Sequence, residues 1–120
     1  MNFGIDLGQV EGALAQGIGW MTMEEITYGT NGRLESNALS TYKVPDIFSA
    51  PKTIETIPLE TEGNNMAIFK SKAVGEPPLM YGIGTYFAIQ HAVKAFNKDY
   101  KLKFHAPFTP EKVLMALYEK

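Results

Sequence analysis

Cysteine is absent from this chain of 120 residues, and the only histidines are His91 and His105. Without cysteine the chain can form no disulfide, bind no iron–sulfur cluster and offer no thiol nucleophile. Two histidines far apart in the sequence also argue against a metal site built from the protein's own side chains. This composition fits the reducing cytoplasm, which is the expected compartment.

Strong positive charge and long apolar runs are missing as well. Arg33 is the single arginine, and the net charge is −2, whereas a nucleic-acid binder needs a basic face. No apolar run approaches the length of a membrane span, and no secretory signal pattern is present. We therefore expect neither nucleic acid nor membrane as a partner. Residues 1–120 are expected to form a single domain with a real core.

Three helices are predicted, over residues 6–23, 77–97 and 110–120. In the first, apolar residues recur with helical spacing, and Asp6 and Gln9 have the spacing of a capping box with Asp6 as N-cap. The second begins near Pro77 or Pro78, since proline suits the first helical turn. Thr109 precedes Pro110, which is a typical start for the third helix.

Five short strands are predicted, over residues 24–28, 33–36, 53–59, 66–72 and 101–104. Residues 29–32, Gly-Thr-Asn-Gly, are a typical hairpin turn between the first two. The predicted fold class is therefore α+β, with three helices packed on a small mixed sheet of about five short strands. Trp20, Tyr42 and Phe69 are expected to be core aromatics.

Glu76 stands between Gly75 and two prolines, at the junction of a predicted strand and a predicted helix. A residue before proline is pushed out of the α region, so the backbone at Glu76 is expected to be stiff and extended. Two interpretations remain open. Glu76 can be an acid that stabilises a helix N-terminus, or a fixed general base.

One face of the first predicted helix carries only small residues, namely Gly8, Gly12, Ala15 and Gly19. Glycine destabilises a helix by roughly 1 kcal/mol relative to alanine, so this face is expected to pack against backbone or a ligand. Gln9 and Gln16 lie on one side of the same helix. Gln9 is either the capping-box residue or a ligand contact, because its amide both donates and accepts hydrogen bonds. Gln16 is expected to be buried or half-buried.

These segments resemble, in the expected order, the C-terminal part of the molybdopterin-binding subunit of the xanthine dehydrogenase and aldehyde oxidase family, a family of molybdenum hydroxylases. The blocks that carry the resemblance are Ile5-Asp6-Leu7-Gly8-Gln9-Val10-Glu11-Gly12-Ala13, Ser40-Thr41-Tyr42-Lys43-Val44-Pro45, Ser71-Lys72-Ala73-Val74-Gly75-Glu76-Pro77-Pro78-Leu79 and Thr109-Pro110-Glu111-Lys112.

The resemblance implies a role for each matching residue. Glu76 falls on the base that takes a proton from the molybdenum-bound hydroxyl, and Gln9 falls on a glutamine that contacts the molybdopterin cofactor. Val74 and Gly75 fall beside the metal, so their backbone is expected to line the site. No side chain of this chain is expected to ligate the metal, because the pterin dithiolene carries it.

The resemblance also implies partners, since the chain matches only a piece of such enzymes. The iron–sulfur clusters and FAD are expected on other segments or subunits, together with the rest of the molybdenum subunit, and no cofactor is expected on the isolated chain. The substrate class that the resemblance implies is a purine, another N-heterocycle or an aldehyde. Nicotinate and aromatic acyl-CoA oxidoreductases are alternatives within the superfamily. A non-catalytic interaction module is the alternative outside it, and the glycine-rich face could also bring two copies together as a homodimer.

Overall fold

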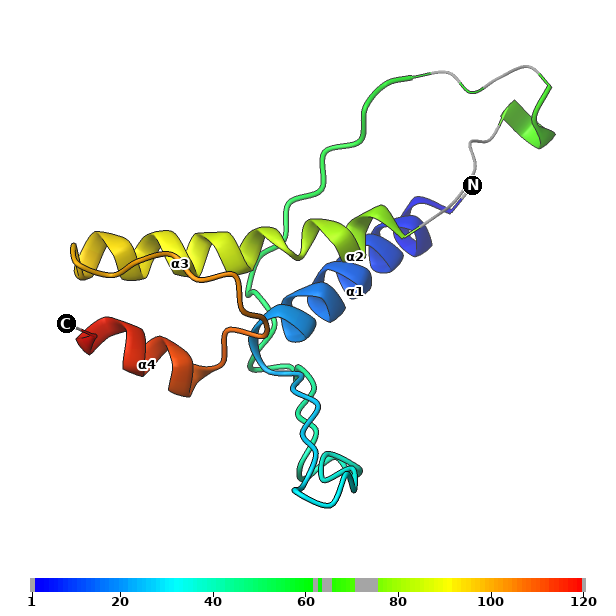
Figure 1. The fold of residues 1–120 in the computed structure, drawn as a ribbon. Coiled ribbons are helices and arrows are strands. Elements are labelled where there is room, and N and C mark those ends of the chain that lie inside the picture. Colours follow the sequence, from blue (N-terminus) through cyan, green and yellow to red (C-terminus); the bar gives the residue numbers. More distant parts are fainter. Residues whose placement is uncertain (1, 62, 64–65, 71–75, 120) are drawn as a thin grey trace.

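The structure is a computed structural model, and it describes residues 2–61, 63, 66–70 and 76–119. These residues form four α-helices and one 3-10 turn, namely α1 (Phe3–Thr22), η1 (Ile68–Lys70), α2 (Pro77–Tyr81), α3 (Gly84–Phe96) and α4 (Pro110–Tyr118). Helix α1 packs on α2 and α3, and α4 packs on α3 (Figure 1). The helices therefore form two packed pairs that share the α2–α3 segment.

The α+β prediction is wrong for the described residues, because they contain no strand. The predicted turn at residues 29–32 is present, since the Gly32 N–H donates to the Gly29 carbonyl at 2.9 Å. Only one antiparallel bridge, between Tyr28 and Leu34, flanks it. Residues 53–59 have no strand partner, and residues 68–70 form η1. An alternating sequence indicates a segment that can form a strand. A strand also needs a neighbouring strand whose backbone forms hydrogen bonds with its N–H and carbonyl groups.

The three predicted helices are present, with two corrections. The N-cap of α1 is Asn2, whose side chain accepts hydrogen bonds from the backbone N–H groups of Gly4 and Ile5. Asp6 therefore lies inside the first turn and is not the N-cap. The third helix has the predicted start, with the Thr109 hydroxyl accepting from the Lys112 N–H.

The second correction concerns the helix predicted over residues 77–97, which is divided at Gly82 and Ile83 into α2 and α3. At this division the hydrogen bonds join residues three apart, for example from the Gly82 N–H to the Leu79 carbonyl at 3.1 Å. The chain therefore tightens there into 3-10 geometry. The division lies where α1 crosses, since a Cβ added at Gly82 would lie 2.6 Å from the Cα of Gly17.

The core is small and joins α1, α3 and α4. Its buried members are Met21, Tyr86, Val93, Tyr100, Phe108 and Ala116. A backbone hydrogen bond of 2.8 Å from the Phe108 N–H to the Met21 carbonyl ties the segment before α4 to the end of α1. Trp20 and Phe69 are not in this core, contrary to the prediction, because they are 45% and 98% exposed. Tyr42 is half-buried and donates to a Glu24 carboxylate oxygen at 2.6 Å.

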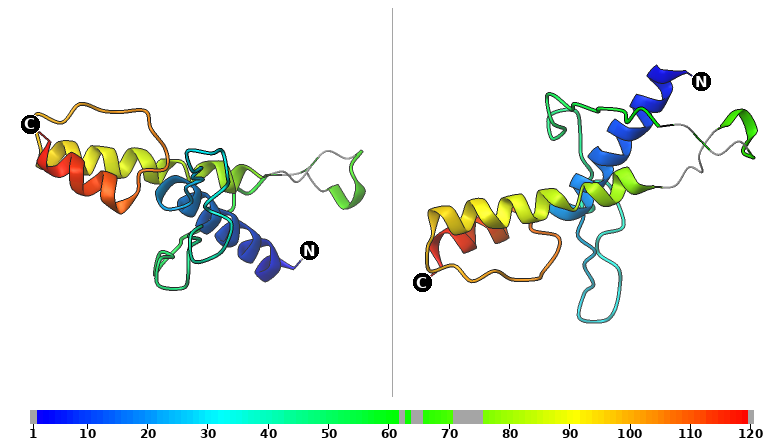
Figure 2. Two further views of the ribbon diagram at one scale, coloured as in Figure 1. Left: turned by 60° about the horizontal axis from the view of Figure 1, so that its bottom comes forward. Right: turned by 90° about the horizontal axis from the view of Figure 1, so that it is seen from above.

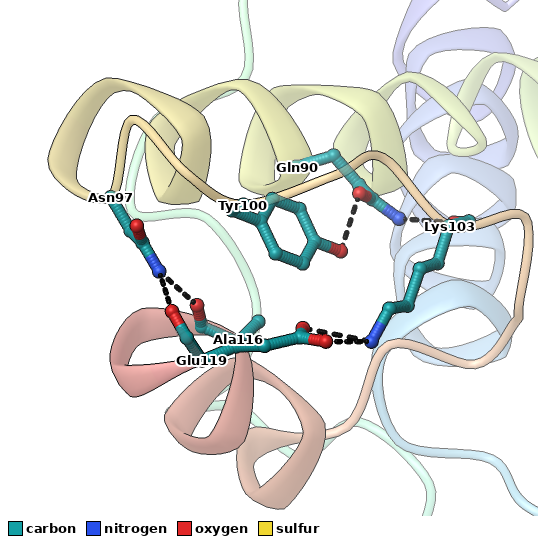
Figure 3. A network of polar contacts seen from close by, with 6 residues as sticks. All are labelled: Gln90, Asn97, Tyr100, Lys103, Ala116 and Glu119. Carbon is teal, nitrogen blue, oxygen red and sulfur yellow. Dashed lines mark hydrogen bonds and ion pairs between the residues drawn. The ribbon is translucent and has the colours of Figure 1, made fainter.

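A polar network inside the α3–α4 pair holds the segment between these helices (Figure 3). The Tyr100 hydroxyl donates to the Gln90 side-chain oxygen at 2.8 Å, and the Gln90 amide donates to the Lys103 carbonyl at 2.6 Å. The Lys103 ammonium pairs with the Glu119 carboxylate at 2.7 Å. Burial raises the pKa of the Tyr100 phenol above its ordinary value, so this side chain stays a hydrogen-bond donor at neutral pH.

Replacing Tyr100 by phenylalanine is expected to destabilise the chain by about 1–3 kcal/mol, because the Gln90 oxygen would lose its donor in a buried position. Gln90 is 2% exposed, so water cannot replace the lost hydroxyl without a rearrangement. Urea unfolding followed by circular dichroism measures the change. The matched control is Tyr118→Phe, at a residue that is 71% exposed, and equal unfolding midpoints for the two variants would contradict the prediction.

Candidate functional site

A hollow of about 490 Å³ lies between α1 and the start of α2, and it is lined by side chains from both helices. Helix α1 contributes Asp6, Gln9 and Gln16, while Glu76 and Pro78 line the opposite side. Among the described residues the polar side chains of the hollow are thus two carboxylates and two carboxamides, without a lysine or arginine. In the described chain Gln9, Gln16 and Glu76 are all exposed, so the hollow is open to one side.

The α1 wall of the hollow is built by helical spacing. Gln9 and Gln16 lie seven residues apart, which is two turns, so both side chains project from the same face. Gly8 and Gly12 also line the hollow, and a Cβ added at either glycine would meet nothing within 4 Å. A planar group can therefore approach the backbone of α1 at these two positions.

The other wall is held by Glu76 and the prolines that follow it. Glu76 occupies the N-cap position of α2, and its side chain makes no capping hydrogen bond. Its backbone, with φ −110° and ψ 37°, lies outside the α region, as a residue before proline requires, but it is not extended as the sequence predicts. The carboxylate is therefore not used to cap the helix that it precedes.

The crossing of α1 and α2 fixes the two walls relative to each other. A Cβ added at Gly17 would lie 2.2 Å from the Leu79 carbonyl oxygen and 3.0 Å from the Gly82 Cα. Such contacts leave no room for any side chain larger than hydrogen. This crossing lies outside the predicted small-residue face, whose Gly8 and Gly12 remain open to the hollow. Of that face Gly19 is closely packed, since a Cβ added there would lie 2.2 Å from Cγ of Pro45.

The structure brings together two of the four site residues predicted from the sequence, since Glu76 and Gln9 line the same hollow. Val74 and Gly75 lie outside the described residues. The capping-box interpretation of Gln9 is wrong, because Asn2 caps α1 and Gln9 stands in its second turn.

Gln16 and Asp6 also line the hollow, although the sequence did not mark them as site residues. Gln16 is exposed instead of buried, which corrects the expectation for this side chain. Its spacing of two turns from Gln9 was the signal that could have placed it on the same wall.

Two further findings bear on what the described residues can bind. They contain no group of three His, Cys, Asp or Glu side chains that could hold a metal ion. Among them, no helix has both the length and the hydrophobicity needed to cross a membrane.

Comparison with known proteins gives a consistent match. Residues 1–51 match the family model of a molybdopterin cofactor-binding domain. The whole chain aligns with xanthine dehydrogenase/oxidase of Felis catus at 42% identity and with xanthine dehydrogenase 1 of Arabidopsis thaliana at 36%. The chain spans about a tenth of the length of these relatives.

The fold matches a solved structure as well. The crystal structure of quinoline 2-oxidoreductase from Pseudomonas putida 86 superposes with a TM-score of 0.83 at 27% identity, over 99% of this chain and 15% of that one. The chain therefore belongs to the xanthine dehydrogenase family of molybdenum hydroxylases, with its match to the molybdopterin cofactor-binding domain in residues 1–51.

Proposed function

We propose that this chain supplies the general base and one wall of the molybdopterin pocket in a cytoplasmic molybdenum hydroxylase, which oxidises an N-heterocycle or an aldehyde with water as the oxygen source. The observation that carries the proposal is the shared hollow, which is lined by Glu76 and Gln9 from separate parts of the sequence. The remainder of the molybdenum subunit and the iron–sulfur and flavin groups come from other segments or subunits, because the chain spans only a tenth of its relatives.

The residues of the hollow fit a pterin. Its ring edges carry N–H donors and carbonyl or nitrogen acceptors, and the carboxamides of Gln9 and Gln16 offer both kinds of partner. The open positions above Gly8 and Gly12 leave space for a flat ring system. Among the described residues no lysine or arginine lines the hollow, and the proposal leaves the phosphate of such a cofactor to other segments.

When bound, molybdopterin supplies the metal that accepts two electrons from the substrate. Glu76 accepts the proton of the attacking oxygen nucleophile at a carboxylate oxygen, and Gln9 orients the cofactor through its amide. The backbone of Val74 and Gly75 is proposed, from the resemblance alone, to line the same site. Pro77 and Pro78 restrict the chain next to Glu76, which keeps the base in position without a capping hydrogen bond to α2.

The names of the relatives favour an N-heterocycle over an aldehyde as substrate. Xanthine is a purine and quinoline is an N-heterocycle, and these are the compounds that the matched enzymes are named for. We therefore propose a ring carbon next to a nitrogen as the position that is oxidised.

Complementation tests the proposed function. A xanthine dehydrogenase-type molybdenum subunit that lacks the matching segment is co-expressed with this chain, and the product is called here the complemented enzyme. We expect oxidation of xanthine or quinoline only when both parts are present. A stable complex that holds molybdopterin but oxidises neither compound would contradict the proposal and favour the non-catalytic module.

Gln9→Leu is expected to lower the molybdopterin content of the complemented enzyme by about tenfold or more, because leucine keeps the size of the side chain but removes its donor and acceptor. The pterin released by denaturation is measured by fluorescence. The control is Gln90→Leu, which loses the same amide far from the hollow and is expected to reduce stability but not the cofactor content per folded molecule. An unchanged pterin content in Gln9→Leu would exclude the contact.

A further inference from the structure

A segment of the chain stands away from the helical core and is strongly apolar at its surface. We call residues 47–61, 63 and 66–70 the arm, and all three views show η1, at its end, separated from the four α-helices (Figures 1 and 2). Ile54 of the arm is half-buried, but its other large apolar side chains are between 75% and 98% exposed, and they are Ile47, Phe48, Ile57, Leu59, Met66, Ile68 and Phe69. Apolar surface exposed to this extent is typical of interaction sites.

The exposed area of the whole chain points the same way. Its accessible surface is 9692 Å², whereas a folded monomer of 13.3 kDa is expected to expose about 6,500 Å². The radius of gyration is 18.4 Å, compared with about 14 Å for a self-contained domain of this length. The excess of about 3,000 Å² on one chain corresponds to about 6,000 Å² over both partners, which is at the upper end of obligate interfaces.

The chemistry of the arm indicates a polypeptide as its partner. Its charges balance, with Lys52 and Lys70 against Glu55 and Glu60, so it has no basic surface for a lipid headgroup or a nucleic acid. Within the described residues, the backbone of residues 53–58 takes part in no hydrogen bond, and another polypeptide can satisfy those groups.

The two phenylalanines of the arm are the candidates for anchors. Phe48 is 92% exposed, and Phe69 is 98% exposed. Phe69 also has a φ of 52°, which is rare for a bulky side chain and is normally maintained by surrounding contacts. Within the described residues Phe69 has almost no such contacts, and burial against a partner would supply them.

We propose that the arm docks onto the remaining polypeptide of the molybdenum subunit, with Phe48 and Phe69 as its two anchors. The choice of partner rests on the proposed function, and it is supported by the relatives, in which about nine tenths of the chain lies outside the matching segment. Aromatic side chains that enter pockets on a partner dominate the binding energy of such interfaces.

Co-purification in the complementation system tests the docking surface. The chain carries an affinity tag, and the amount of truncated molybdenum subunit recovered with it is measured for Phe48→Asp and for Phe69→Asp. We expect each variant to recover at most about one tenth of the subunit that the unchanged chain recovers. The matched control is Met115→Asp on α4, which changes a residue that is 73% exposed and far from the arm, and it is expected to recover the normal amount.

Two additional readouts keep the outcomes separate. Circular dichroism of the tagged chain must be unchanged in the arm variants, since both side chains lie outside the core. Glu76→Gln must co-purify normally even though it is expected to be inactive, so a failure of docking is distinguished from a failure of the proposed chemistry. Three outcomes would each overturn the proposal. The arm variants could recover the normal amount of subunit, or Met115→Asp could lose as much as they do. The arm variants could also bind the subunit normally and lose only self-association of the chain.

Discussion

Glu76→Gln is expected to lower kcat/KM of the complemented enzyme by about 10²–10⁴-fold, which is the usual contribution of a positioned general base. Glutamine has nearly the same shape as glutamate but cannot accept a proton at neutral pH. Because the Glu76 side chain makes no capping hydrogen bond, the substitution removes basicity and little else. Steady-state rates with xanthine, together with the molybdenum content, measure the effect.

The control for this prediction is Glu11→Gln, which makes the same chemical change on α1 at an exposed residue that does not line the hollow. It is expected to leave both the rate and the metal content unchanged. If Glu76→Gln turned over at the normal rate with a full complement of molybdenum, the carboxylate would have no part in the chemistry. A loss of metal in step with the rate would instead make Glu76 a cofactor-binding residue.

Gly17→Ala is expected to destabilise the chain by about 1–3 kcal/mol, since the new methyl group would overlap the Leu79 carbonyl oxygen at 2.2 Å. Neither atom belongs to a flexible side chain, so α1 and α2 must move apart. The same movement widens the hollow and separates Glu76 from Gln9. The free energy of unfolding from urea titration and kcat/KM of the complemented enzyme are therefore both expected to fall.

Gly12→Ala is the matched control, because it makes the same substitution in the same helix at a position where a Cβ meets nothing. Alanine favours helix over glycine by roughly 1 kcal/mol, so this variant is expected to be slightly more stable than the parent chain. If Gly17→Ala were stabilised to the same extent, the close crossing of the two helices would not exist in solution.

The helices could be predicted from the sequence because their signals are local. The start of α4 is signalled by Thr109 and Pro110 alone, and the helix begins where these two residues predict. The N-cap of α1 was misplaced because Asp6 and Gln9 imitate a capping box three residues inside the helix. The division between α2 and α3 depends on the crossing of Gly17 over Gly82, which is a contact between distant segments and leaves no local signal beyond a glycine.

The strands could not be predicted correctly for a different physical reason. Residues 53–59 alternate as a strand does, but pairing depends on a neighbour, and none exists within the described chain. Phe69 was expected in a core because it is a large aromatic residue, but burial also depends on a neighbour, and this side chain is almost fully exposed. Both errors fall in the arm, where the sequence pattern suits a larger assembly than the chain itself.

The site was only partly accessible from local patterns. Physical reasoning about Glu76 favoured a helix-terminal acid over a base, and the family resemblance was needed to assign the catalytic role. The structure adds that Gln9 is not a capping residue, and that Gln16 and Asp6 line the same hollow. These residues share a wall because of helical spacing, which a search for motifs does not consider.

The most direct measurement is a crystal structure of the complemented enzyme with its cofactor and a slowly reacting N-heterocycle bound. We expect the pterin against the α1 wall, a Gln9 amide contact to it, and a Glu76 carboxylate oxygen within about 2.6–3.2 Å of the group it deprotonates. A structure in which protein side chains fill the space between α1 and α2, with the cofactor bound elsewhere, would contradict the assignment of this hollow.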